Sequence, residues 1–187
     1  MTSTRDQIIQ TTSELLENQG YHATGLNEIV RESGAPKGSI YYYFPDGKEG
    51  ITSEAVKFAG RVVSERINIH LAKYEDPAES IRSFIETIAH FVEKSGYKSG
   101  GPLTIVSSET ATTSEKLNLV CREAYGMVRM AFQTKLVASG FSEEKAENLS
   151  WVIVSAIEGG VILSRTYHTG EPLRKVAREL AALVNNH

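Results

Sequence analysis

The sequence predicts an all-α fold of about nine helices, and three observations support this. Apolar residues recur at spacings of three and four along almost the whole chain. No segment shows the alternation of apolar and polar residues that marks a half-buried strand. Glycine and proline interrupt the helical stretches where helices commonly end and begin. With 187 residues, of which 41% are hydrophobic and 23% charged, the chain has an ordinary globular composition and can bury a core.

Three short helices are expected before residue 45. The first begins at Thr4–Gln7, which has the spacing of a capping box, and Gly20 ends it. Gly34 ends the second helix, and Pro36 opens the third as a first-turn proline. The third ends at Phe44, because the residue before a proline is pushed out of helical angles. The expected ranges are about 4–19, 26–33 and 36–44, and Leu26, Ile29 and Val30 form the apolar face of the second.

Six further helices follow. The first of them is long and joins the N-terminal helices to the rest of the chain without an evident flexible linker. Asp76 is expected to cap the next one, with a proline in the first helical position, and a loop at 95–102 follows that helix. Gly140 and Gly170 are expected as helix stops. The expected ranges are about 48–73, 76–94, 103–110, 114–139, 142–168 and 172–185.

Charge and composition exclude several classes of protein. The net charge is −3, whereas a protein that coats DNA through its phosphates is strongly basic. Any DNA binding must therefore depend on a few placed groups. No signal peptide and no apolar run of about 18 residues is present, so we expect a cytoplasmic protein with no membrane partner. The single cysteine, Cys121, cannot form an internal disulfide and is interpreted as an inert core thiol.

Catalytic and metal-binding patterns are absent from the sequence. It contains no zinc-protease, nucleophile-elbow or phosphate-loop motif, so we expect no enzyme and no cofactor. The five histidines, at positions 22, 70, 90, 168 and 187, do not have metal-ligand spacing, so no metal site is predicted.

The second and third helices, joined by a glycine turn, have the arrangement of a helix-turn-helix. In the third helix Ile40 and Phe44 lie four residues apart and are expected to face inward. Three consecutive tyrosines cannot all be buried on so short a helix, so at least two should expose their rings and form a contact surface. The alternative is that the tyrosines pack against the first and fourth helices. The outward residues are Lys37, Gly38, Ser39, Tyr41, Tyr42 and Tyr43.

These residue types suit a DNA surface. A lysine can bind guanine acceptors or a phosphate, and a glycine lets the start of the helix approach the bases closely. Serine and tyrosine hydroxyls can donate to phosphate oxygens, and a tyrosine ring can contact a thymine methyl group.

From Thr4 to about Val56 the chain resembles the TetR/AcrR family of bacterial regulators, and GYHATGLNEIVRESGAPKGSIYYYFPDGKEGI carries the resemblance. FPDGKEG, GGPLT and EGGVILSR are similar to the LmrA/YxaF-like subgroup of lincomycin-resistance regulators. The resemblance implies a homeodomain-like three-helix DNA-binding domain over residues 1–50, extending to about 63 with the connecting helix. It also implies a ligand-binding and dimerisation domain over 51–187.

The resemblance assigns roles to residues at matching positions. It implies base contacts for Lys37, Gly38, Tyr41 and Tyr42, and phosphate contacts for Thr24, Ser39, Tyr43 and Lys48. Thr24 also matches the family's capping threonine. At two positions the chain departs from the family: Tyr43 stands where many members have histidine, and Ala35 stands where a capping serine or threonine is common. The implied function is a homodimeric repressor that a small, largely apolar or aromatic inducer releases from a palindromic double-stranded operator.

The helix around Trp151–Leu163 is apolar all round, so we expect it to be buried on more than one side. The resemblance implies that the last two helices form the homodimer interface, and close helix approach would explain Gly159 and Gly160. Glu158 is the only charge in this helix between Glu147 and Arg165, so it needs a partner. It could bond a ligand, or pair with an arginine (Arg165, Arg122 or Arg129), or lie in a polar seam at the dimer interface.

A pocket between helices could be lined by aromatic and aliphatic side chains, although each of these could equally be plain core. A further alternative is a DNA-binding module that acts through a protein partner without a small ligand. The candidate ligand residues are Phe84, Ile88, Phe91, Tyr125, Trp151 and Glu158, and Phe132 is a further candidate for the pocket lining.

Overall fold

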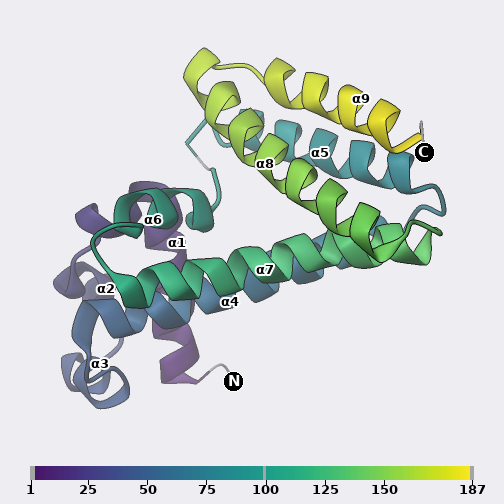
Figure 1. Cartoon of the computed structure of the whole chain (residues 1–187). Helices are drawn as coiled ribbons and strands as arrows, with labels where there is room; N and C mark the ends of the chain where they lie inside the picture. The colour runs from purple at the N-terminus through teal and green to yellow at the C-terminus, as the bar shows by residue number, and fades with distance from the viewer. Residues whose placement is uncertain (1–2, 99, 186–187) are drawn as a thin grey trace. The chain divides into compact units, whose positions relative to one another are not determined.

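The computed structural model describes residues 3–98 and 100–185, and all regular structure in these residues is helical (Figure 1). The all-α prediction is confirmed. The nine helices in this part of the chain are α1 (Thr4–Ala23), α2 (Leu26–Ser33), α3 (Lys37–Tyr43), α4 (Gly47–Leu71), α5 (Pro77–Lys94), α6 (Pro102–Thr110), α7 (Glu115–Ala138), α8 (Glu143–Tyr167) and α9 (Glu171–Asn185).

The helix ends agree with the expected ones to within a few residues, but several caps differ, among them those of α1 and α8. Ser3, not Thr4, caps α1: its Oγ accepts the backbone N–H of Asp6 at 3.1 Å. The side-chain Nε2 of Gln7 donates to the Ser33 carbonyl at 2.8 Å and is not part of a capping box. His168, with a left-handed φ of 52°, ends α8, so the expected stop at Gly170 is wrong.

Contacts divide the chain into two compact units. One, here called the N-terminal unit, contains the residues up to Val62 together with Gly101–Tyr125. The other, here called the C-terminal unit, contains Val63–Gly100 and the residues from Gly126 onward. Segment 101–125 therefore belongs to the same unit as residues up to 62, although it is distant in sequence, and its helix α6 packs against α1. The functional division at residues 50 and 51 stays a prediction.

The N-terminal unit buries a core between α1, α2, α3 and the start of α4. Here α6 lies against α1 (Figure 1). Short helices of this kind depend on tertiary packing for most of their stability. The buried members of the core are Ile8, Ile9, Ile29, Ala35, Ile40, Phe44 and Ile51, with Leu15, Leu26, Val30 and Phe58 packed against them.

In the C-terminal unit α5, α8 and α9 lie side by side (Figure 1). Asp76 caps α5 as expected, with its carboxylate accepting the amides of Ala78 and Glu79 at 3.2 and 3.0 Å. Gly160 allows α8 to approach α9 closely, because a Cβ there would lie 2.8 Å from the Leu173 side chain. The expected close approach at Gly160 is therefore confirmed, and it occurs inside one chain.

Cys121 is buried, at 3% exposure, and burial raises the pKa of its thiol to about 11. Since the thiolate is the nucleophile, a thiol with this pKa is almost entirely unreactive at pH 8. We expect the native protein to bind no thiol reagent within minutes at pH 8, and one equivalent per chain after unfolding in guanidinium. A colorimetric thiol titration with and without denaturant checks this, and rapid native labelling would contradict it.

Candidate nucleic-acid interface

The turn between α2 and α3 sets where α3 begins. Gly34 ends α2 in a left-handed conformation, with φ 64° and ψ 7°. Pro36 then occupies the N-cap of α3, one position earlier than expected, and forms no side-chain cap. Within the described residues no side chain caps the start of α3, which leaves this turn open to an outside partner.

Two side chains hold α3 in the N-terminal unit. Ile40 is 1% exposed and Phe44 is 3% exposed, and both belong to the buried core of this unit. Their predicted inward orientation is confirmed. Because these two residues fix one side of a seven-residue helix, the remaining side chains of α3 face away from the core.

The three tyrosines are all on the surface. Tyr41, Tyr42 and Tyr43 are 54%, 80% and 39% exposed. The Tyr42 and Tyr43 rings pack edge to face, with their centroids 5.0 Å apart. The prediction that at least two rings are exposed is confirmed, and an apolar contact surface of this kind indicates a binding partner.

The first turn of α3 is equally accessible. Lys37 is exposed and makes no ion pair or hydrogen bond within the residues that the structure describes. Gly38 is exposed, and a Cβ built on it would meet nothing within 4 Å. Ser39 is half-buried. Glycine in a helix costs about 1 kcal/mol relative to alanine, and no contact inside the described protein explains it at position 38.

Thr24 is buried and does not cap α2, contrary to expectation. Its side chain is only 1% exposed, and its hydroxyl donates to the Gly20 carbonyl at 2.7 Å. The residue at the N-cap of α2 is Gly25, so the expected role of Thr24 as the cap of this helix is wrong. A phosphate contact through the Thr24 hydroxyl would require that hydroxyl to leave its present bond.

Lys48 lies in the first turn of α4 and is half-buried. Its Nζ is 4.3 Å from the centroid of the Tyr21 ring and donates to the His22 carbonyl at 3.4 Å. Burial lowers the pKa of this lysine, and the Glu109 carboxylate opposes that shift. Lys48 is therefore held against the end of α1, which no local sequence pattern predicts.

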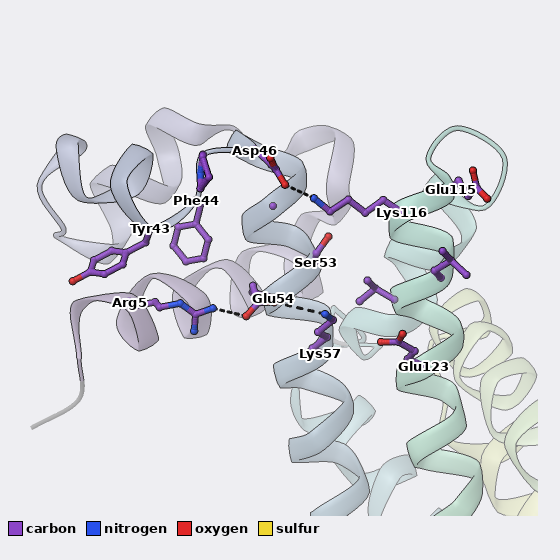
Figure 2. Close-up of a pocket in the computed structure, with 14 residues that line it drawn as sticks. Arg5, Tyr43, Phe44, Asp46, Ser53, Glu54, Lys57, Glu115, Lys116 and Glu123 are labelled. Carbon is purple, nitrogen blue, oxygen red and sulfur yellow. Dashed lines mark hydrogen bonds and ion pairs between the residues drawn. The ribbon is translucent and has the colours of Figure 1, made fainter.

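The N-terminal unit also contains a cavity of about 640 Å³, which the sequence did not predict (Figure 2). Ion pairs bridge its walls: Arg5 lies 2.5 Å from Glu54, and Lys116 lies 2.5 Å from Asp46. None of the six candidate ligand residues lines it. The lining residues come from four separate segments of the chain, so no single sequence motif could have revealed the cavity. They include Tyr43, Phe44, Ser53, Lys57, Leu119 and Glu123.

The six candidate ligand residues are not all enclosed. Phe91 and Trp151 are 52% and 55% exposed. Within a single chain, neither side chain therefore lines an interior pocket as expected. Phe84 is half-buried, with its ring 5.8 Å from the fully buried Phe132. Ile88 is also half-buried. Their role as ligand contacts stays a prediction.

Tyr125 and Glu158 are the remaining two candidates. Tyr125 is assigned to the N-terminal unit and the other five to the C-terminal unit. Glu158 is half-buried on α8.

Among residues 3–98 and 100–185, no cluster of histidine, cysteine and carboxylate side chains could hold a metal ion. One of the five histidines, His187, lies outside these residues.

The helix α8 buries only one of its sides within the chain. Its buried side includes Ile153, Val154 and Val161, whereas its other side exposes apolar residues, so burial on more than one side would require a partner and stays a prediction. At about 100° per residue, the exposed residues share one side of the helix. We call them the α8 apolar face: Trp151, Val152, Ile162, Leu163 and Tyr167, which are 46–70% exposed.

By length and composition α8 could also cross a membrane, with a mean hydropathy of 1.3 over its most apolar window. It packs, however, against α9, whose other side carries charged residues that hydrocarbon would not accept. These exposed charges are Lys175, Arg178 and Glu179.

Comparisons with known proteins agree with this architecture. Residues 8–55 match the family model "Bacterial regulatory proteins, tetR family", and residues 77–179 match "Transcriptional regulator LmrA/YxaF-like, C-terminal domain". The chain is 43% identical to the uncharacterised HTH-type transcriptional regulator YxaF of Bacillus subtilis, over 96% of this chain and 94% of that protein. It is 37% identical to the HTH-type transcriptional regulator LmrA of the same organism, over 92% of each.

A TetR transcriptional regulator from Legionella pneumophila has a similar fold, with a TM-score of 0.79 over 98% of both chains at 19% identity. Bacillus subtilis FadR in complex with stearoyl-CoA has a TM-score of 0.69 at 18% identity, over 95% of this chain and 96% of that one. Both likenesses concern the fold. The helix-turn-helix with its exposed third helix, the two matching domain models and the two close relatives establish that this chain belongs to the TetR family of DNA-binding transcriptional regulators, with a C-terminal domain of the LmrA/YxaF-like type.

Proposed function

We propose that this protein is a cytoplasmic, homodimeric repressor that binds a palindromic operator through α3 and leaves it when a small ligand binds the C-terminal unit. The outward side of α3 supports the proposed DNA binding. It combines a lysine with no ion pair among the described residues, a glycine next to open space and three exposed tyrosines on a helix anchored by Ile40 and Phe44. Lys37, Gly38, Tyr41 and Tyr42 would contact bases, and Ser39, Tyr43 and Lys48 would contact phosphates.

The α8 apolar face supports a homodimer through α8 and α9. Large exposed apolar faces on soluble proteins mark protein interfaces. Gly159 faces open space in one chain, so a second copy could approach closely there. Leu183, 37% exposed on α9, would extend the interface. The charged outer side of α9 favours this partner over a lipid bilayer.

The identity of the ligand rests on chemistry alone. The half-buried Phe84 and Ile88 on α5 favour a largely apolar or aromatic molecule, and Glu158 could bind a hydroxyl or cationic group on it. Bacillus subtilis FadR, which shares the fold, binds stearoyl-CoA, an apolar chain with a polar head. A regulator that acts through a protein partner would instead respond to no small molecule.

Footprinting on the DNA that flanks the protein's own gene tests the proposal. We expect protection of two inverted half-sites on one side of the duplex, about one helical turn (~34 Å) or somewhat more apart, because a two-fold dimer requires two-fold DNA. Adding a panel of apolar and aromatic compounds should abolish protection for at least one of them. Protection of a single asymmetric half-site by one protomer would contradict the dimeric part of the proposal.

Gly38→Ala separates stability from DNA binding. The added methyl group meets nothing within 4 Å, so we expect the free energy of unfolding to rise by roughly 0.5–1 kcal/mol. Operator affinity should fall, because the methyl group would lie between α3 and the bases. Chemical denaturation and fluorescence anisotropy measure the two effects.

Gly126→Ala is the matched control for this substitution. Gly126 is also helical and also next to open space, but it lies on α7. This variant should gain stability and bind the operator as the wild type does. Unchanged operator binding by Gly38→Ala would remove the argument for close approach at position 38.

A further inference from the structure

The helix α1 is broken near its end. Gly20 has φ 80° and ψ −178°, a conformation that residues with a Cβ rarely adopt, and Tyr21–Ala23 form a separate last turn. A break in a helix leaves amide N–H groups that have lost their carbonyl partner four residues earlier. The new turn therefore needs a hydrogen-bond acceptor from outside α1.

Glu109 on α6 supplies that acceptor. Its carboxylate accepts the backbone N–H of His22 at 2.9 Å, across 87 residues of sequence. The positive φ favours glycine at the break, and a Cβ on Gly20 would also overlap the Glu109 carboxylate and lie 2.7 Å from the Ile105 side chain. A hydrogen bond from an amide to a carboxylate is stronger than one between neutral groups.

The same turn holds Lys48. The Tyr21 ring lies below its ammonium group at 4.3 Å, and the His22 carbonyl accepts from it at 3.4 Å. Glu109 and Lys48 therefore both bind the backbone of His22: Glu109 accepts its N–H, and Lys48 donates to its carbonyl. All of these residues lie in the N-terminal unit.

We propose that Glu109 is a positioning residue for DNA binding: by bonding the His22 N–H it fixes the last turn of α1, and this turn holds Lys48 in place for a DNA phosphate. The inference rests on the proposed function, since it requires that the chain binds an operator. Glu109 itself touches no DNA in this account.

Whether operator affinity rises or falls when Glu109 is replaced distinguishes a positioning role from an effect of its negative charge alone. DNA is a polyanion, so a carboxylate beside a phosphate-binding lysine repels it. If Glu109 acted only through its charge, removing that charge would tighten operator binding. Positioning through the hydrogen bond requires the opposite result, namely weaker binding when the acceptor is lost.

The test compares Glu109→Ala, which removes the acceptor, with Glu109→Gln, which keeps an acceptor oxygen but no charge. Fluorescence anisotropy on the operator duplex found by footprinting measures the affinity. We expect Glu109→Ala to bind about 3- to 10-fold more weakly than the wild type, which corresponds to part of one charged hydrogen bond. Glu109→Gln keeps the acceptor and loses only the charge, so it should bind about as tightly as the wild type or more tightly. If Glu109→Ala does not fold, Glu109→Met, which keeps the length of the side chain without the carboxylate, takes its place, and binding at or above wild-type affinity by that variant overturns the inference.

Glu115→Gln is the matched control, because Glu115 is exposed in the same unit and no hydrogen bond or ion pair joins its side chain to α1 in the described residues. It should bind the operator as tightly as the wild type or slightly more tightly. In a Lys48→Ala background, Glu109→Ala should cause little further loss of affinity. If the two losses multiply instead, Glu109 does not act through Lys48 and the inference is overturned.

Amide hydrogen exchange supplies a readout that needs no DNA. The His22 amide should exchange at least about tenfold faster in Glu109→Ala, the factor expected when about 1.4 kcal/mol of local protection is lost, and should not change in Glu115→Gln. Unchanged exchange in Glu109→Ala would overturn the inference. Equal or tighter operator binding by Glu109→Ala would also overturn it, yet leave the proposed function standing. A wild type that protects no DNA would overturn both.

Discussion

Replacing Lys37 or Tyr42 by alanine is expected to weaken operator binding about 5- to 150-fold, the range for losing one direct base contact. Both side chains are exposed and neither belongs to the core, so the fold and the dimer should be unchanged. Tyr42 is the most exposed of the three tyrosines, at 80%, so truncating it removes little packing inside the chain. Anisotropy titrations at fixed salt, with circular dichroism to check folding, measure the effect.

Three further variants refine this prediction. Tyr42→Phe keeps the ring, so it should bind like the wild type if the ring contacts a thymine methyl group, and like Tyr42→Ala if the hydroxyl bonds a phosphate. Lys37→Ala should also reduce the salt dependence of binding by about one charge if this lysine meets a phosphate. Lys94→Ala, at an exposed position on α5, is the control and should change nothing. Normal binding by both folded alanine variants would refute the assignment of α3 as the DNA-reading helix.

A charge placed on the α8 apolar face should separate the dimer. In Ile162→Glu a carboxylate replaces a side chain that is 50% exposed in one chain and, in the proposed dimer, buried against the second copy. Burying an unpaired carboxylate is very costly, so we expect a folded monomer at micromolar concentration. Operator affinity should fall by about 100-fold or more, because two linked half-site contacts become one. Sedimentation or light scattering gives the mass, and anisotropy gives the affinity.

Ile69→Glu is the control for this experiment. Ile69 is also an exposed isoleucine, at 58%, but it lies on α4 and outside the α8 apolar face. This variant should remain dimeric and bind the operator normally. If Ile162→Glu remains a dimer of full affinity, the interface does not run through the α8 apolar face, and another surface must be sought.

The sequence was sufficient for the features of α3 that depend on the spacing of residues along the helix. The inward placement of Ile40 and Phe44 follows from a spacing of four residues, and the exposure of the tyrosines follows because a short helix has too little buried surface for all three. The caps were less predictable. Ser3 and Thr4 are chemically alike and adjacent, and the extended backbone of Ser3, with φ −68° and ψ 155°, makes Ser3 the cap of α1.

The candidate ligand site shows where pattern reading fails. A period of three and four identifies an apolar side chain on a helix, but it does not tell a face that packs inside the chain from one left for a partner. Phe91 and Trp151 fit the pattern of core residues and are nevertheless more than half exposed. Gly159 and Gly160 are adjacent in sequence, yet only Gly160 meets another helix of the same chain.

The sequence by itself therefore determined the all-helical fold, the approximate helix boundaries, the outward side of α3 and, through resemblance, the family. The tertiary structure alone decided that Thr24 is buried, that Lys48 lies on Tyr21, and that Glu109 caps a break in α1 from 87 residues away. The physical reason is the range of the interactions. Helix periodicity and turn chemistry act over a few residues, whereas the partner of a broken helix turn depends on which distant segment the packed core brings beside it.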